Sequence, residues 1–504
     1  MQYGRRIITG FGLGLSLVCG CASPRHEPTT QPPIHENPTA PPHARLEPLP
    51  AVVPAQFVEA SDVKSDNNHY PLDLATALQL AGSQNPLVSL AQEQIRHAEA
   101  LEENADALWL PSIRGGVGWN RHEGTLQDTS GNVISSSRNS LYTGLGAGAV
   151  GAGSPVVPGV QANFHLADAL YRPLAARQAR TAREHAAAAV LNDTLLQVCQ
   201  GYLELLRAEQ DAVIAAETFE NARKLAELTA QYAIAGQGLK SDAERMQVEL
   251  SLRHNDLQKS EEAVAVASAR LNESLSLEPG VQLQCLETVV TPWKLVSTEV
   301  PLTSLIEQGL CNRPELAERR ALVYEAQQNL RREEMSPRLP HLAVGASYGG
   351  FGGGKSSSVD NFNDRVDLDA VAYWELRNLG FGDQAARRAA QAEVGMASLR
   401  QSATSDRVVR EIAEAFAQVQ ARRRQIETAR QAILSAQDSY QHNVVRIKNV
   451  QGLPIEVLQS IQALSAARRE YLRSVIDFNT AQFALLRAVG WRLYQVDLST
   501  TANP

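Results

Sequence analysis

Apolar residues recur at helical spacing over long segments of this chain, and short stretches of strict alternation interrupt them. The spacing of three and four residues predicts helices, and apolar/polar alternation predicts strands. The longest helical segment of the first half would span on the order of 100 Å at about 1.5 Å per residue. The first half is predicted to contain helices over 72–108, strands over 113–120 and 160–166, and helices over 171–235 and 241–277.

The second half repeats this order. Asn85-Pro86 has a counterpart in Asn312-Arg313-Pro314, and Gly238 with Asp242 matches Gly452 with Glu456. An internal repeat constrains the architecture more tightly than any single motif. The second half is predicted to contain helices over 302–334, strands over 342–348 and 366–376, and helices over 383–449 and 455–488.

The predicted strands have two unlike faces. In the last strand Val366 and Leu368 lie on one face, and Asp367 and Asp369 on the other. This pattern suits a wall between lipid and water, and also a half-buried sheet of a soluble protein. The Gly/Ser/Thr-rich residues 121–157 are predicted to connect the first two strands. Four strands cannot close on themselves, and open edges are not tolerated in lipid, so the pattern points to an oligomer and a membrane.

Composition narrows the class of protein. Among 504 residues, aromatics make up only 5%, which favours Ala- and Leu-rich helical packing over a large enzyme core. The net charge of −8 and the lack of a basic face with interleaved aromatics argue against a nucleic-acid-binding protein. After residue 20, no stretch reaches the roughly 18 consecutive apolar residues of a spanning helix.

The N-terminus resembles a bacterial lipoprotein signal. Arg5 and Arg6 precede an apolar run, which ends in Val18-Cys19-Gly20-Cys21-Ala22. Residues 1–20 are therefore predicted to be a signal peptide, with Cys21 as the lipid attachment site. Because Ala22 follows the cysteine, the lipoprotein sorting scheme suggests the outer membrane. The alternative is an ordinary signal peptide with incidental cysteines. Residues 21–70, rich in Pro, are predicted to be an extended tether.

The three remaining cysteines match no metal site in their spacing. Cys285 and Cys311 could pair in an oxidising periplasm, and the sequence leaves this open. Cys199 has the position of a helix-core residue. We predict no metal, no cofactor and no catalytic residue in this chain.

Two glycine-rich motifs imitate nucleotide-binding loops. Residues 349–356 match the phosphate-loop pattern with Lys355 and Ser356, yet polar residues and another strand follow instead of a helix. Gly146, Gly148 and Gly151 fit a dinucleotide pattern, again without a following helix. We interpret both as loop or strand glycines.

The duplicated order of elements resembles the TolC-type outer-membrane efflux channels, in particular their lipid-anchored branch. The resemblance covers about residues 70–490. It is carried by the repeat itself, by Ala372-Tyr373-Trp374-Glu375-Leu376 running to Gly380-Phe381-Gly382, and by the turn segments 232–242 and 446–458.

The resemblance implies a mostly α fold with β strands, built from a duplicated helix-strand-strand-helix-helix unit. It further implies a homotrimer with a 12-stranded transmembrane β-barrel continuous with a long periplasmic α-helical tunnel. A periplasmic adaptor protein and an inner-membrane pump would dock on its tip. The expected domains are a first repeat over 71–280, an equatorial linker over 281–300, a second repeat over 301–490 and a tail over 491–504.

The resemblance also suggests gate residues at the tip of the tunnel. Glu456 aligns with a tip carboxylate of the family and Asp242 is its counterpart in the first repeat, while Gln459 replaces a second acidic position of some members. Converging carboxylates repel each other and attract cations. The alternative is that both acids simply favour the helix N-termini where they lie. The latch candidates between helices are Tyr232, Arg245 and Arg446.

The predicted function is passive conduction of substrates through the outer membrane from an inner-membrane pump and its adaptor. The main alternative is the periplasmic adaptor itself, which also carries a lipid anchor and helical hairpins. Adaptors, however, place one hairpin inside β domains, whereas here strands lie between helices twice.

Overall fold

The computed structural model describes residues 69–147, 157–278, 280–287, 289–297, 299–449 and 451–491. The chain divides into two units, residues 1–54 and 55–504, and all described residues belong to the second. Cys21, the predicted signal peptide and nearly all of the predicted tether lie outside the described residues.

The first repeat contains the predicted helices and strands, preceded by a short strand. The longest helix, α3, has 69 residues, which corresponds to about 100 Å. The elements are β1 (His69–Leu72), α1 (Leu74–Gln84), α2 (Pro86–Asp106), the 3-10 turn η1 (Ala107–Trp109), β2 (Ser112–Ile113), β3 (Gly115–Gln127), β4 (Val133–Ala147), β5 (Val157–Pro158), β6 (Val160–His165), α3 (Leu166–Ile234) and α4 (Lys240–Leu275).

The second repeat follows in the same order, so the duplicated architecture predicted from the sequence is confirmed. Its long helix, α7, has 68 residues and nearly equals α3. The elements are β7 (Gln282–Cys285), α5 (Leu302–Asn312), α6 (Pro314–Met335), β8 (His341–Lys355), β9 (Asp360–Tyr373), the 3-10 turn η2 (Arg377–Gly380), α7 (Phe381–Lys448) and α8 (Pro454–Ala488).

Local sequence signals explain where the short helices begin. The Asp73 side chain accepts a hydrogen bond from the Thr76 N–H (3.2 Å) at the start of α1. Asn85 accepts from the Leu87 N–H (2.8 Å) at the start of α2, where Pro86 is the first helical residue. Such caps satisfy backbone donors that a helix N-terminus leaves unpaired, and proline has no N–H to lose there. The Asn-Pro signature therefore marks a true helix boundary.

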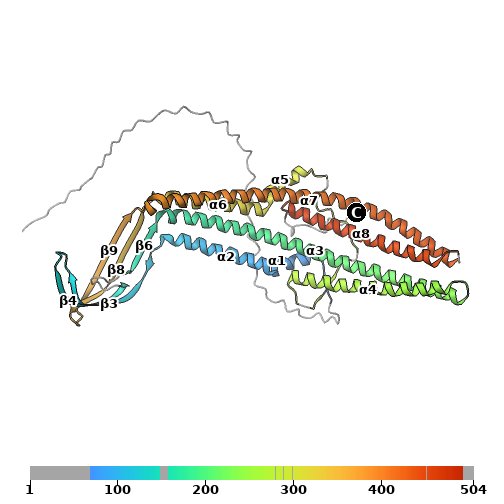
Figure 1. Ribbon diagram of the computed structural model, residues 1–504, viewed down its shortest axis with the longest axis horizontal. Coiled ribbons are helices and arrows are strands. Elements are labelled where there is room, and N and C mark those ends of the chain that lie inside the picture. The colour runs from blue at the N-terminus through green and yellow to red at the C-terminus, as the bar shows by residue number, and fades with distance from the viewer. Residues whose placement is uncertain are drawn as a thin grey trace, which may run out of the picture. The chain divides into compact units, whose positions relative to one another are not determined.

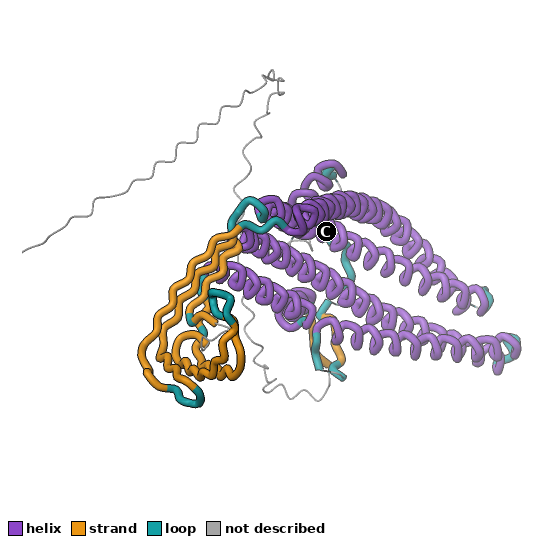
Figure 2. The backbone as a smooth tube through the Cα atoms, turned by 60° about the vertical axis from the view of Figure 1, so that its left-hand side comes forward, coloured by secondary structure: helices purple, strands orange, loops and turns teal. Residues whose placement is uncertain are grey.

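The larger sheet lies at one end of the long helices, and α3 and α7 run directly on from it (Figure 1). At its centre is β8, which pairs antiparallel with β9 on one side and with β6 and then β4 on the other. β3 pairs with β4, and β2 with β6. Figure 2 shows these strands as one curved group separate from the helices. Because β6 and β4 succeed each other along β8, the sheet is four strands wide, as the sequence predicted.

The two faces of this sheet differ in chemistry. Val344 of β8 lies opposite Ala370 and beside Leu368 of β9, and these apolar side chains share one face. Ser347 pairs with Asp367 on the other face, and their side chains form a hydrogen bond of 3.4 Å. Alternation of this kind places mostly apolar side chains on one side of this part of the sheet and polar ones on the other.

The helices form two long antiparallel pairs, α3 with α4 and α7 with α8, which lie side by side in both views (Figures 1 and 2). α3 also contacts α8, and α2 and α6 flank α3 nearer the sheet. The main core lies where the two repeats meet. Its largest fully buried side chains include Tyr202 of α3 and Phe483 of α8.

A two-stranded parallel pair joins the repeats next to this core. β1 pairs with β7 over four residues, from His69 opposite Gln282 to Leu72 opposite Cys285. The sequence predicted a helical start near Leu72, whereas Leu72 ends β1 and α1 begins at Leu74. β7 lies within residues 281–300, the predicted linker between the repeats. None of the described helices contains an apolar stretch long enough to cross a membrane.

The prediction for residues 121–157 was also wrong in part. β3 extends to Gln127 and β4 covers Val133–Ala147, so most of this segment is a long hairpin. Its turn is organised by Asp128, whose side chain accepts from the N–H groups of Ser130 (3.0 Å) and Asn132 (2.8 Å). Because Gly and Ser residues are frequent here, the sequence shows no alternation of apolar and polar positions. The backbones of β3 and β4 nevertheless pair in register.

The three cysteines of the described residues are unpaired. Cys285 is buried in β7 and Cys311 is exposed on α5, and both are free thiols. Cys199 lies in the core of α3, as predicted, and burial raises the pKa of its thiol to about 12. A disulfide between Cys285 and Cys311 is therefore not part of this fold.

Candidate functional site

Two helix-to-helix turns form the end of the molecule opposite the sheet, and the predicted gate residues lie in them. In the first, α3 ends at Ile234 and the chain reverses through Gly236, whose φ of +73° favours glycine. The N–H of Gly238 donates to the Tyr232 carbonyl (3.0 Å). A Cβ at Gly238 would lie 3.2 Å from the Tyr232 Cβ, so a side chain there would crowd the turn.

The second turn has the same construction. The Gln451 N–H donates to the Arg446 carbonyl (2.9 Å), and a Cβ at Gly452 would lie 3.1 Å from the Arg446 Cβ. Arg446 thus occupies in the second repeat the position that Tyr232 occupies in the first. Asp242 and Glu456 are each the third residue of the helix that follows, α4 and α8.

Glu456 and Arg446 form an ion pair across the second turn. Arg446 Nη1 lies 3.2 Å from Glu456 Oε2, with side chains 50% and 36% exposed. The same carboxylate accepts a hydrogen bond of 3.4 Å from the N–H of Leu453, the cap of α8. The Glu456 side chain therefore caps the N-terminus of α8 and pairs with Arg446 at the same time.

Tyr232 connects the two helical pairs. Its hydroxyl donates to the backbone carbonyl of Ile447 (3.3 Å), so the end of α3 is tied to the end of α7. The ring packs on a small apolar cluster under the tip. The cluster consists of Leu225, Ala226, Met246, Ile447, Val457, Leu458 and Ile461.

The other two predicted residues stand apart. Asp242 is partly exposed and Arg245 exposed on α4, and within the described part of the chain neither forms an ion pair. The structure therefore brings Tyr232, Arg446 and Glu456 together around the α3, α7 and α8 ends, but leaves Asp242 and Arg245 on the far helix of the first pair.

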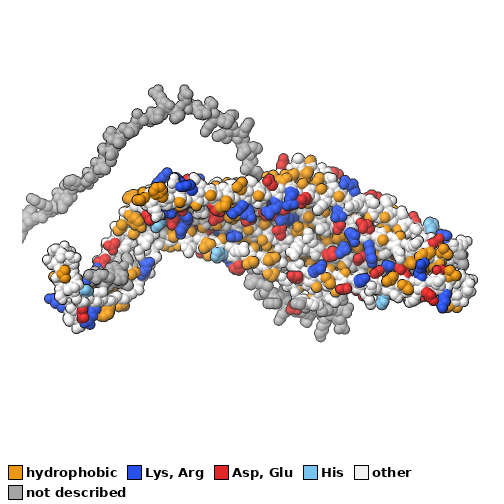
Figure 3. Space-filling model, viewed as in Figure 1, with side chains coloured by type: hydrophobic (Ala, Val, Ile, Leu, Met, Phe, Trp, Pro, Cys, Tyr) orange, Lys and Arg blue, Asp and Glu red, His pale blue; other side chains and the backbone are white. Residues whose placement is uncertain are grey.

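Apolar side chains are exposed at this tip. Ile234 is 87% exposed, Leu239 67% and Leu453 59%. Hydrophobic and charged side chains alternate over this end of the surface in Figure 3. Large apolar residues exposed at a helical end are typical of a surface that contacts another protein.

Comparison with solved structures supports the fold. CmeC, an outer-membrane channel of Campylobacter jejuni, superimposes with a TM-score of 0.69 and 14% identity, over 85% of this chain and 88% of CmeC. VceC, an outer-membrane protein of Vibrio cholerae, gives 0.66 and 15%, over 83% and 96%. CusC, described in relation to transmembrane channel formation, gives 0.67 and 18%, over 83% and 92%. A comparison with curated protein sequences finds no match.

Sequence comparison identifies one part of the chain. The model of the outer membrane efflux protein family matches residues 305–491, nearly all of the second repeat. The second repeat is therefore an outer membrane efflux protein domain. Within it, residues 349–355 are part of β8 and Ser356 begins its turn, so no helix follows the phosphate-loop motif.

The structure has further contacts between the two helical pairs that sequence reasoning missed. The Gln462 side chain of α8 donates to Glu249 of α4 (2.8 Å), which also pairs with Arg253 (2.8 Å). Further from the tip than Gln462, Arg469 of α8 pairs with Asp211 of α3 (3.0 Å). The spacing of Glu249 and Arg253 was a visible local signal, but their partner Gln462 lies 213 residues away.

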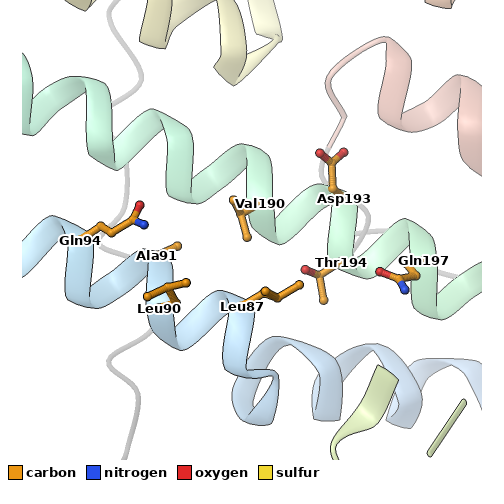
Figure 4. Close-up of a pocket in the computed structure, with 8 residues that line it drawn as sticks. All are labelled: Leu87, Leu90, Ala91, Gln94, Val190, Asp193, Thr194 and Gln197. Carbon is orange, nitrogen blue, oxygen red and sulfur yellow. The ribbon is translucent and has the colours of Figure 1, made fainter. Parts of the chain in front are cut away.

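One shallow groove lies away from the tip, between α2 and α3 (Figure 4). It has a volume of about 270 Å³ and is lined mainly by apolar side chains, including Leu87, Leu90 and Val190. Its one titratable residue, Asp193, accepts a hydrogen bond from Arg487 (2.7 Å) and is therefore engaged elsewhere. Among the described residues, no group of His, Cys, Asp and Glu is arranged to hold a metal ion.

Proposed function

We propose that this protein is the outer-membrane channel of a tripartite export system, which passively conducts substrates delivered by an inner-membrane pump and a periplasmic adaptor. The observation that carries the proposal is the sheet with one apolar and one polar face, continuous with two antiparallel helical pairs of about 100 Å. The apolar face suits lipid, the polar face suits water, and the helices suit a passage through the periplasm.

The proposal includes a homotrimer. β3 and β9 are the edges of the sheet, and edge strands present unpaired backbone groups that lipid does not satisfy. Joining the β9 edge of one copy to the β3 edge of the next would satisfy them. Three copies would supply about twelve strands, within the range of known outer-membrane channels.

The proposal places the gate at the helical tip. The Arg446–Glu456 ion pair and the Tyr232 hydrogen bond to Ile447 hold the ends of α7, α8 and α3 together. In a trimer, three copies of Glu456 and of Asp242 would surround one axis, and like carboxylates attract cations there. Arg245 lies in the same part of α4 and could pair with a neighbouring copy. Opening would then require the latch contacts around α7 and α8 to separate.

The adaptor and the pump would dock on the exposed apolar tip, around Ile234, Leu239 and Leu453. No observation favours the alternative in which this chain is itself the adaptor. In both repeats the strands lie between helices, whereas an adaptor places its helical hairpin between strands.

The lipid anchor remains part of the proposal on sequence grounds. Acylation at Cys21 would tether the chain to the outer membrane, and residues 22–68 would bridge the anchor and β1. The proposed location is the outer membrane, with the helices in the periplasm.

Single-channel conductance of the purified protein in a planar bilayer tests this function. We expect long-lived, cation-selective steps from a species with the mass of three copies. To separate a shut gate from no channel, the Arg446→Ala variant is measured beside the wild type, because it lacks the 3.2 Å ion pair that closes the second turn. A folded trimer that never conducts, with or without Arg446, would contradict the proposal.

A further inference from the structure

Three basic side chains lie at one level of the sheet, near the end of β8 that is remote from the helices. The register places His122 of β3 opposite Arg138 of β4, and Arg138 opposite Lys355 of β8. Directly opposed residues in antiparallel strands have their Cβ atoms about 5 Å apart. We call His122, Arg138 and Lys355 the basic row. Figure 3 shows Lys, Arg and His side chains at this end of the molecule.

The basic row lies on the polar face of the sheet. Side chains alternate along β8, so Lys355 shares a face with Phe351 and Ser347. The Arg365 guanidinium lies 5.2 Å from the Phe351 ring centre, and Ser347 bonds to Asp367, both on that face. The apolar face carries Trp119 opposite Leu141, which belong to the alternate positions of β3 and β4.

The basic row has polar atoms without partners. Nε and Nη2 of Arg138 and Nε2 of His122 have no hydrogen-bond partner within the described residues, and neither has Oδ1 of Asn120 beside them. Arg138 is partly exposed and Lys355 is exposed, so the row can be reached from the solvent. In that same part of the chain, no carboxylate forms an ion pair with Arg138 or Lys355. Nearby Glu123 pairs with Arg121 on the apolar face, and Asp360 lies opposite Gly353, two residues before Lys355.

This arrangement is unfavourable unless an anion completes it. Like charges directly opposite each other across strands repel, and unpaired donors shielded from water reduce stability. A guanidinium presents a planar fork of N–H groups that matches an oxyanion, and an ammonium adds a point charge beside it. We propose that the basic row is a binding site for a multivalent oxyanion, of the phosphoryl class, on the polar face of the sheet.

The location gives the site a role that rests on the proposed function. If the polar face lines a channel, the basic row would lie near its outer mouth, at the opposite end from the helical tip. A bound anion there would neutralise the mouth, and three copies would place three such sites around one axis.

Isothermal titration of the detergent-purified full-length protein with inorganic pyrophosphate tests the inference. We expect saturable binding at low ionic strength with one site per chain. Arg138→Gln and Lys355→Gln should each weaken the affinity at least tenfold. Lys355 is exposed, so its variant is expected to fold even if the Arg138 variant does not. Arg121→Gln is the matched control, since Arg121 lies one residue away on the apolar face and pairs with Glu123.

Three outcomes would overturn the inference. The first is no pyrophosphate binding by the wild type. The second is equal binding by the wild type, Lys355→Gln and the Arg121→Gln control. The third is binding that appears only with vesicles containing lipid phosphates, since those headgroups lie on the apolar side. Conductance measured on the same preparation keeps the two proposals separate. A conducting protein without binding refutes the basic-row site alone, and binding without conductance refutes the channel alone.

Discussion

At the scale of single residues, Glu456 combines two roles that have different energetic weights. Its ion pair with Arg446 is half exposed, and exposed pairs contribute about 0–1 kcal/mol to stability. Its carboxylate also accepts from the Leu453 N–H, and a neutral amide can keep this hydrogen bond. The charge of Glu456 is therefore nearly dispensable for folding, which leaves it free to act on ions.

We predict that Glu456→Gln lowers the cation selectivity of the channel while the melting temperature changes little. Reversal potentials in a salt gradient measure the first quantity, and thermal unfolding measures the second. Glu470→Gln is the control, because Glu470 is an exposed carboxylate of α8 beside Arg473, far from the tip. Selectivity equal in both variants would remove Glu456 from the gate.

At the scale of elements, a buried ionic network ties four helices together. Arg313, only 3% exposed, pairs with Glu315 and Glu411 (2.8 Å each) at the junction of α5 and α6. Arg487 of α8 pairs with the same two carboxylates at 3.0 and 2.8 Å. Arg313 also donates to the carbonyl of Ala488 (3.2 Å). In the Asn-Arg-Pro signature, Pro314 is therefore the first residue of α6, and Arg313 connects this end of α6 to α7 and α8.

We predict that Arg313→Ala lowers the free energy of unfolding by about 1.5–3 kcal/mol, because it removes one of the two guanidinium groups that pair with Glu315 and Glu411. Arg473→Ala, on the exposed face of α8, should change it by less than about 0.5 kcal/mol. Thermal or denaturant unfolding of both variants measures the difference. Similar values for the two would show that the network does not stabilise the fold.

The same network sets a pH dependence. Burial alone would raise the pKa of Glu315, but hydrogen bonds and charge from Arg313, with the charge of Arg487, outweigh it and hold the pKa below the ordinary 4.5. The stability that this depressed pKa provides is present above about pH 4.5 and is lost as the pH falls through the folded-state value. The loss in free energy of unfolding caused by Arg313→Ala should therefore become smaller as the pH is lowered.

The elements also show what sequence could and could not predict. Periodicity accumulates over the tens of residues of α3 and α7, so both helices were predicted, although α3 begins five residues before the predicted start at 171. β1 and β7 are four residues each and form only because the distant partner exists, and no local pattern signals that. The Gly- and Ser-rich hairpin of β3 and β4 was missed for the same reason, since its order comes from backbone pairing.

The candidate site follows the same rule. Arg446 and Glu456 lie in one turn, and their proximity follows from helix geometry and from the repeat. The contact of Tyr232 with Ile447, and that of Gln462 with Glu249, join residues more than 200 positions apart. Contacts between helical pairs depend on how the helices pack, so no spacing in the sequence reports them.

At the scale of the whole molecule, charged side chains gather at both ends. The tip bears Glu456 and Asp242 together with Arg446 and Arg245, and the far end of the sheet bears the basic row. Charges of both signs along a passage attract both cations and anions, so neither Glu456 nor the basic row alone decides what is conducted. Cargo selection would then rest mainly with the proteins that dock on the tip.

The membrane anchor is the last whole-molecule feature, and it can be separated from the channel. The sheet already offers an apolar face to lipid, so acylation at Cys21 would add attachment without being needed for assembly. We predict that Cys21→Ser abolishes incorporation of labelled palmitate, whereas the purified variant still forms trimers and conducts like the wild type. Cys19→Ser is the matched control and should remain acylated. Palmitate on the Cys21→Ser protein would refute the lipobox assignment, and loss of trimers in that variant would mean that the anchor is part of the assembly itself.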